Sequence, residues 1–265
     1  MNELIAEVLP DDRPLPFWQH MGEVRDRLIR SALALLVSTA AAYFFRFSLW
    51  DWAKRPFIAA MARRLQVPAA TLQPFAFTDL AEPFFSLMRL SFWAAVFAVS
   101  PYLFYQVWTF VRPALREREK KMASTFVLVT SACFISGAVF SYFVIFPILG
   151  DLLLDEAVKA GLRANLRPTE YLDLFLYTVA GAGISFEAPV LFYFLARFRL
   201  VTSRSMLRYW REATVAILFA AAFLTPGDVI ATTILFGVVL LGLYFVSTGV
   251  VWLVERSRRG GPTPE

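Results

Sequence analysis

The sequence predicts an all-α, polytopic membrane protein with six transmembrane helices, both termini cytoplasmic and a short fifth span. Hydrophobic residues make up 58% of the 265 residues, and the mean hydropathy is +0.57. A soluble domain of this length needs far fewer apolar residues. Long apolar runs alternate with charged segments, as expected for successive spans. The cations are distributed unevenly over those segments, which predicts the orientation.

The first span is predicted at residues 29–45, whose 17 residues give about 26 Å of helix. Residues 1–19 hold four acids and three prolines and are expected to form a flexible cytoplasmic tail. Residues 20–30, HMGEVRDRLIR, have apolar positions at helical spacing and predict a short amphipathic helix that runs into the first span. A cleaved signal peptide is the competing interpretation, but the acidic lead is unlike a basic n-region.

Residues 46–83 carry four prolines and are predicted to lie outside the membrane, with a short helix at 57–65. The second span, 84–111, contains Pro101, which predicts a kink, and Arg89, which is expected to snorkel to the interface. The third span, 122–146, is predicted to end at Pro147.

The rest of the chain is predicted to form a polar helix and loop, a fourth span, a short fifth span, a sixth span and a cytoplasmic tail, at 148–170, 171–198, 213–224, 229–254 and 255–265. The fifth span has only 12 residues, or about 18 Å of helix. We expect one transmembrane domain over residues 1–265.

The positive charges favour cytoplasmic termini. Seventeen Lys and Arg residues fall in the two terminal segments and the loops at 112–121 and 197–211, against eight in the two opposite segments. Cytoplasmic segments of membrane proteins are enriched in these residues. The seven tryptophans, Trp108 among them, are mostly near span ends and are interpreted as interface anchors.

The composition excludes several kinds of site. With one cysteine, Cys133, and one histidine, His20, the chain cannot form an internal disulfide or a multi-histidine metal site. It also has no GxxxxGK[ST] loop to hold nucleotide phosphates. No cofactor, metal or nucleic-acid partner is expected, and membrane lipid surrounds the spans.

The segment 112–121, between two spans, is the candidate working surface. It holds five cations and the acids Glu117 and Glu119. A second patch of acids and arginines lies at residues 23–30, and the two patches can form one composite site if they face the same compartment. The competing interpretation is that these acids only pair with neighbouring arginines.

Five motifs resemble the TatC family, the multispanning receptor of the twin-arginine protein translocase. They are His20 to Leu28 (HMGEVRDRL), Pro56, Tyr105 to Phe110 (YQVWTF) with Pro113-Ala114-Leu115 and Glu119, Ser185 to Pro189 (SFEAP), and Thr225 to Asp228 (TPGD). The resemblance extends from about residue 19 to residue 254 in the order of the family, and departs from it at Gly227.

The resemblance implies a non-enzymatic function. A member of this family recognises the SRRxFLK-like signal peptide of an already folded cargo protein. It then assembles with small single-span subunits of the TatA and TatB type into an oligomeric complex. Transport is driven by the proton-motive force across the plasma (inner) membrane.

The resemblance also implies a peptide-binding site formed by Glu23, Arg25, Phe110 and Glu119. A guanidinium presents a planar fork that a carboxylate accepts with two parallel hydrogen bonds, so Glu23 and Glu119 are the candidates for the paired arginines. The residues alone do not distinguish Glu119 from Glu117. Because the segment 112–121 carries a net charge of +3, its average field repels a basic peptide. Recognition of the signal peptide is therefore expected to depend on local pairs between arginines and carboxylates.

Three further residues are assigned to assembly with partner subunits: Glu187, Pro56 and Asp228. Glu187 lies inside the fourth span, where an acid normally faces the protein interior. Pro189, two positions on, removes the hydrogen bond to the Ser185 carbonyl, so a polar notch is expected to receive a polar group of a partner span. The alternatives are an acid satisfied by its own kinked helix, and helix capping for Asp228.

Two other functions compete. In a proton-coupled small-solute transporter, Glu187 would carry the proton. An intramembrane protease would need a Ser/His pair or two facing aspartates inside spans, and His20 lies outside the predicted spans.

Overall fold

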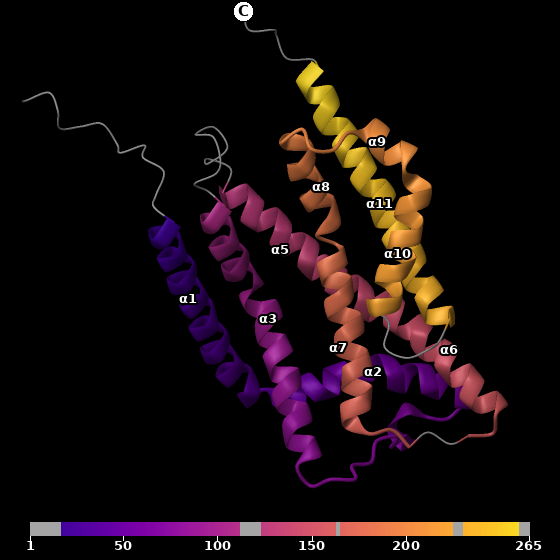
Figure 1. Cartoon of the computed structure of the whole chain (residues 1–265). Coiled ribbons are helices and arrows are strands. Elements are labelled where there is room, and N and C mark those ends of the chain that lie inside the picture. The colour runs from indigo at the N-terminus through magenta and orange to yellow at the C-terminus, as the bar shows by residue number, and fades with distance from the viewer. Residues whose placement is uncertain (1–16, 112–122, 163–164, 225–229, 260–265) are drawn as a thin grey trace, which may run out of the picture.

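The computed structural model describes residues 17–111, 123–162, 165–224 and 230–259, and almost all of their regular structure is helical (Figure 1). Within these ranges the only β-type pairing is a single bridge between Phe75 and Leu166. The elements are α1 (Phe17–Phe44), α2 (Arg46–Leu65), η1 (Ala69–Thr71), α3 (Glu82–Val111), α5 (Ala123–Phe140), η3 (Ser141–Ile145), α6 (Phe146–Lys159), α7 (Pro168–Ser185), α8 (Ala188–Arg197), α9 (Ser203–Arg208), α10 (Trp210–Leu224) and α11 (Ile230–Arg259).

Five stretches of the described helices are long and apolar enough to cross a bilayer: Val24–Phe44, Glu82–Phe110, Ser124–Lys159, Pro168–Arg197 and Thr233–Arg258. Each overlaps one of the predicted spans. The predicted fifth span lies in α10, whose 15 residues give about 22 Å of helix. The chain is therefore a multi-pass membrane protein, and the sixth crossing remains a prediction.

The two ends of the helix bundle are built differently (Figure 1). α2, α6 and the start of α7 lie together at one end, here called the α2 end. α1 begins, α3 ends, α5 begins and α8 ends at the opposite end, here called the α8 end. α1 packs mainly against α3, and none of the residues in its most apolar window is buried.

One predicted boundary in the first third of the chain is wrong. The amphipathic segment runs into the first span as predicted, and the two form one helix that begins at Phe17. The helix expected at 57–65 begins at Arg46 and runs through Pro56. Proline leaves the carbonyl four residues before it without an N–H donor. Here that carbonyl belongs to Trp52, and the Tyr142 hydroxyl donates to it at 2.9 Å.

The prediction that the third span ends at Pro147 is also wrong, because the helix continues through η3 into α6 as far as Lys159. η3 is a π-helical turn in which the Phe146 N–H donates to the Ser141 carbonyl, five residues back. The shift in register comes just before Pro147, which falls in the first turn of α6, where a missing N–H costs little.

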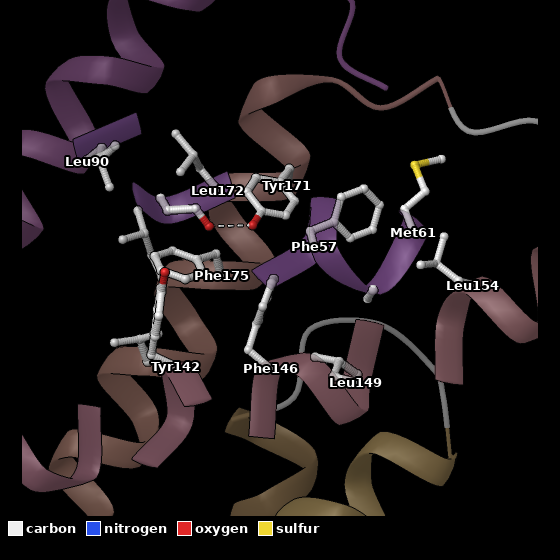
Figure 2. Close-up of a cluster of buried hydrophobic side chains, with 14 residues drawn as sticks. Phe57, Met61, Leu90, Tyr142, Phe146, Leu149, Leu154, Tyr171, Leu172 and Phe175 are labelled. Carbon is white, nitrogen blue, oxygen red and sulfur yellow. Dashed lines mark hydrogen bonds between the residues drawn. The ribbon is translucent and has the colours of Figure 1, made fainter. Parts of the chain in front are cut away.

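An aromatic core fills the α2 end (Figure 2). The Trp52 and Tyr142 rings stack with centroids 4.0 Å apart, and the Tyr171 hydroxyl donates to the Ala53 carbonyl at 2.7 Å. Large apolar side chains from α2, α6 and α7 surround them, including Phe57, Met61, Phe146, Leu149, Leu154, Leu172 and Phe175. Two ion pairs, Arg63 with Asp151 (3.3 Å) and Arg64 with Asp155 (3.0 Å), join α2 to α6 at its rim.

A buried carboxylate ties the start of α3 to the start of α7. The Glu82 side chain is 3% exposed and accepts hydrogen bonds from the Thr169 hydroxyl (2.9 Å) and the Thr78 N–H (3.2 Å). Arg167 donates to the same carboxylate at 3.4 Å. About two turns further along α3, Arg89 pairs with Asp173 of α7, and the two side chains are 45% and 37% exposed. The snorkelling of Arg89 to the interface stays a prediction.

Candidate functional site

Two of the four predicted peptide-binding residues have described side chains, and both belong to the α8 end. Arg25 lies near the start of α1, and Phe110 is the second-last residue of α3. Because α1 and α3 pack side by side and run in opposite directions, these two helix ends lie at the same end of the bundle (Figure 1). The structure therefore brings Arg25 and Phe110 to one end of the bundle, as the sequence predicts.

The two predicted carboxylates are described incompletely. Glu23 belongs to α1, but its side chain is outside the described set. Glu119 lies in 112–122, outside the described residues, and this segment connects the end of α3 to the start of α5. The predicted pairing of Glu23 with Glu119 stays a prediction.

Arg25 is exposed at the membrane-proximal part of α1. Its guanidinium lies 3.3 Å from the Asp26 carboxylate, and the two side chains are 76% and 57% exposed. Exposed ion pairs of this kind contribute about 0–1 kcal/mol, so the contact does little to fix the arginine. Phe110 is 39% exposed at the neighbouring helix end. Both side chains are therefore accessible at this end of the bundle.

Trp108 anchors the end of α3 next to Phe110. Its indole is 3% exposed, with the Phe126 ring of α5 at 4.6 Å and the Phe194 ring of α8 at 6.1 Å. The interpretation of Trp108 as an interface anchor is wrong, because its side chain is buried inside the protein. Helical spacing along α3 does not reveal that α5 and α8 cover this residue. The buried Nε1 has no hydrogen-bond partner among the described residues.

The basic loop after α8 is tied to α11. Glu255 accepts hydrogen bonds from the Ser203 N–H (3.0 Å) and the Ser203 hydroxyl (2.5 Å). The Arg258 guanidinium donates to the Arg197 carbonyl, the last residue of α8. These contacts fix α9 and the end of α8 against the last helix.

Glu187 lies at a break in the fourth span. α7 ends at Ser185 and α8 starts at Ala188, with Pro189 in its first turn. The Glu187 Oε1 atom is buried and has no hydrogen-bond partner among the described residues. A buried unsatisfied carboxylate oxygen is costly, which is consistent with a group that meets a partner elsewhere.

A close crossing of α5 and α7 positions this break. A Cβ added to Gly137 would lie 2.6 Å from the Ala182 carbonyl oxygen, and one added to Gly183 would lie 2.9 Å from the Phe134 ring. Small residues let helix backbones approach in this way within membranes. The GAG motif at 181–183 can be recognised in the sequence, but the sequence does not show that Gly137 is the residue packed against it.

The two other residues assigned to assembly have different outcomes. Pro56 is buried inside α2, where it frees the Trp52 carbonyl for Tyr142. The structure thus gives it an internal packing role, and its role in assembly remains untested. Asp228 lies in 225–229, outside the described residues. No group of three or more His, Cys, Asp or Glu side chains within the described part of the chain could hold a metal.

The five long apolar stretches of the described helices, with an aromatic core at one end of the bundle, define a multi-pass membrane protein. Residues 19–237 match the family model described as Sec-independent protein translocase protein (TatC). The chain therefore belongs to the TatC family, and its role is in protein transport by the twin-arginine translocase.

Curated relatives support this over nearly the full chain. The TatC protein of Desulforapulum autotrophicum is 33% identical over 237 residues, covering 89% of this chain and 84% of the relative. That of Koribacter versatilis is 30% identical over 246 residues, covering 92% and 88%. A crystal structure of the twin-arginine translocase receptor TatC matches with a TM-score of 0.76 at 27% identity, covering 89% of this chain and all of that chain.

Proposed function

We propose that the chain is the signal-peptide receptor and core subunit of a translocase that exports folded proteins with twin-arginine signal peptides. The observation that carries the proposal is the meeting of the α1 start and the α3 end at the α8 end, with Arg25 and Phe110 exposed there. A solved relative at 27% identity is described as the twin-arginine translocase receptor.

In this proposal, Glu23 and Glu119 bind the two signal-peptide arginines. The paired guanidiniums require two nearby carboxylates, because each fork is best satisfied by a bidentate acceptor. Arg25 and Phe110 complete the surface, Phe110 by apolar contact with the residues after the arginine pair. The anchoring of Trp108 between Phe126 and Phe194 keeps the end of α3 rigid while the peptide binds.

The test is photo-crosslinking of a twin-arginine peptide to the full-length protein in membrane vesicles. Glu119→Lys or Glu23→Ala should abolish the crosslink while the protein still inserts. Glu117→Lys is the matched control and should retain it, because only Glu119 is assigned to the site. A wild-type yield from either of the first two variants would refute the assignment.

The orientation and energetics belong to the same proposal. Six spans with both termini cytoplasmic place the α8 end in the cytosol, as the excess of Lys and Arg in those segments favours. The membrane is the plasma (inner) membrane, and the proton-motive force drives transport. Cysteine labelling from each side of the membrane, at Arg204 in the α8-end loop and at Thr71 in η1, tests the orientation.

Glu187 is proposed to receive a polar group from a small single-span subunit of the TatA or TatB type during assembly. Its unsatisfied Oε1 and the helix break beside it support this. Glu187→Ala should leave peptide crosslinking intact and reduce export of a folded reporter at least about tenfold, the effect of losing one buried charged hydrogen bond. Glu187→Gln should retain part of the activity. Export at the wild-type rate from Glu187→Ala would exclude the role.

A further inference from the structure

A second feature of the α8 end is an apolar cavity of about 420 Å³ between α3, α5, α8 and α11. Its volume lies in the range of about 300–1,000 Å³ that is typical of small-ligand sites. Trp108, Phe126 and Phe194 line one side, and Val250 of α11 lines another. Among the described residues of the proposed peptide surface, Arg25 and Phe110 are not part of the cavity lining.

The lining changes in character along its length. α5 contributes Thr125 and Cys133, eight residues or about 12 Å apart along the helix. Thr125 lies at the start of α5 and Arg197 is the last residue of α8, both at the α8 end, where the Phe126 and Phe194 rings are 5.1 Å apart. Cys133 and Pro189 lie farther along these helices from the α8 end. The deep part is therefore apolar, and the polar side chains lie toward the mouth.

The mouth is cationic. Arg197 is exposed there, and Arg258 of α11 donates to the Arg197 carbonyl, which brings a second guanidinium to the same turn. Glu255, three residues before Arg258 on α11, accepts hydrogen bonds from Ser203, so its carboxylate and the two guanidiniums together carry a net charge of +1. The Trp108 ring contributes to the apolar lining, and its buried Nε1–H has no acceptor among the described residues. An anion with oxygen acceptors complements this set of donors.

We infer that this cavity binds one acyl chain of an anionic phospholipid, with the phosphate at Arg197 and Arg258. A cationic mouth above an apolar shaft between transmembrane helices matches an anionic lipid headgroup and its tail. Water is a poor occupant, because the deep lining offers too few hydrogen-bond partners. An extended peptide segment is also disfavoured, since its backbone amides would be unsatisfied among Val129, Cys133 and Val190, and the tests below distinguish a helical peptide from a lipid.

The first test uses the wild-type protein in nanodiscs that contain phosphatidylglycerol with a photoreactive group near the end of one acyl chain. Crosslinks should map to α5 around Val129 or α8 around Val190. Unlabelled phosphatidylglycerol should compete. Phosphatidylcholine with the same chains should compete about fivefold less well, because it lacks the net negative charge that attracts one arginine by about 1 kcal/mol. Crosslinks spread evenly over lipid-facing helices would overturn the inference.

Two matched pairs of variants sharpen the test through native mass spectrometry of retained lipid. Val129→Phe adds a ring inside the cavity and should abolish retention of phosphatidylglycerol. Leu128→Phe adds the same group at a neighbouring position that is 71% exposed and should not. Arg197→Gln should remove the preference for phosphatidylglycerol, whereas Arg204→Gln, in the same basic loop, should keep it.

The outcomes of these tests show whether the cavity holds a lipid acyl chain or part of a signal peptide. If Val129→Phe fails to fold, the wild-type crosslinking map still tests the site. Retention of phosphatidylglycerol by Val129→Phe at the wild-type level would overturn the inference. So would crosslinking of a photoreactive residue at Val129 to a bound signal peptide in place of lipid.

Discussion

The α2 end and the α8 end of this molecule differ in how their largest buried polar side chains are satisfied. Each end has exceptions, such as the Ser141 Oγ beside Tyr142, which has no partner among the described residues, and the Glu255–Ser203 contact. At the α2 end, the Trp52 and Ala53 carbonyls are bonded to tyrosine hydroxyls, and the buried Glu82 carboxylate has several donors. At the α8 end and in the span leading to it, Trp108 Nε1 and Glu187 Oε1 are buried and have no partner among the described residues. Within the described residues, the tyrosine hydroxyls and the Glu82 carboxylate of the α2 end are therefore satisfied inside the protein, whereas Trp108 Nε1 and Glu187 Oε1 are not.

The largest effect should come from opening the aromatic core. Phe146 is 1% exposed, so Phe146→Ala should lower the free energy of unfolding by about 3–5 kcal/mol, from lost burial and the cavity that remains. Phe143→Ala, at a side chain 67% exposed in the adjacent π turn, is the control and should cost far less. Denaturation in mixed micelles measures both, and equal losses would contradict a packed core at this end.

The next largest effect should come from Glu82. Glu82→Ala leaves the Thr78 N–H and the Thr169 hydroxyl without their acceptor at the α3–α7 junction. The variant should unfold at a clearly lower denaturant concentration than the wild type and expose 66–81 to protease. The control is Glu170→Ala, which removes a carboxylate that is 64% exposed in the first turn of α7, next to Thr169. It should change neither the denaturation midpoint nor the protease sensitivity.

A smaller effect tests how α2 tolerates its internal proline. Tyr142→Phe removes the donor to the Trp52 carbonyl and should cost about 0.5–1.5 kcal/mol. Pro56→Ala gives that carbonyl a backbone donor of its own, so Tyr142→Phe should cost less in that background. A double-mutant cycle measures the coupling. Additive costs would show that the hydroxyl does not compensate for the proline.

The smallest effect should come from the rim. Arg63 pairs with Asp151 at 3.3 Å, but the two side chains are 62% and 37% exposed. Arg63→Ala should therefore lower the free energy of unfolding by less than about 1 kcal/mol. The loss should shrink further in 0.5 M salt, which screens exposed charges. A loss as large as that of Phe146→Ala would reverse the contrast between core and rim.

The sequence predicted the parts of the fold that depend on local pattern. Five apolar helices lie where hydropathy predicts them, since burial in lipid depends on composition and length. It failed where a distant partner satisfies a local defect. Pro147 does not end its helix because a π turn precedes it, and Pro56 is tolerated because Tyr142 supplies a hydrogen bond. Neither compensation leaves a signal near the proline itself.

The candidate site was predictable only from its motifs. Arg25 and Phe110 are distant in sequence, and helical periodicity does not reveal that α1 and α3 pack in opposite directions. Trp108 was misassigned because its burial depends on Phe126 and Phe194. The choice of Glu119 over Glu117 rests on the family motif, since both acids lie in the same charged segment.

The contrast between the two ends is tested most directly by placing one photoreactive residue at each. Phe110 at the α8 end and Phe77 at the α2 end are 39% and 59% exposed, so both positions can react. A twin-arginine peptide should crosslink from position 110 and not from position 77, and a peptide with two lysines should crosslink from neither. Equal yields from the two positions, or crosslinking from position 77 alone, would contradict the assignment of peptide binding to the α8 end.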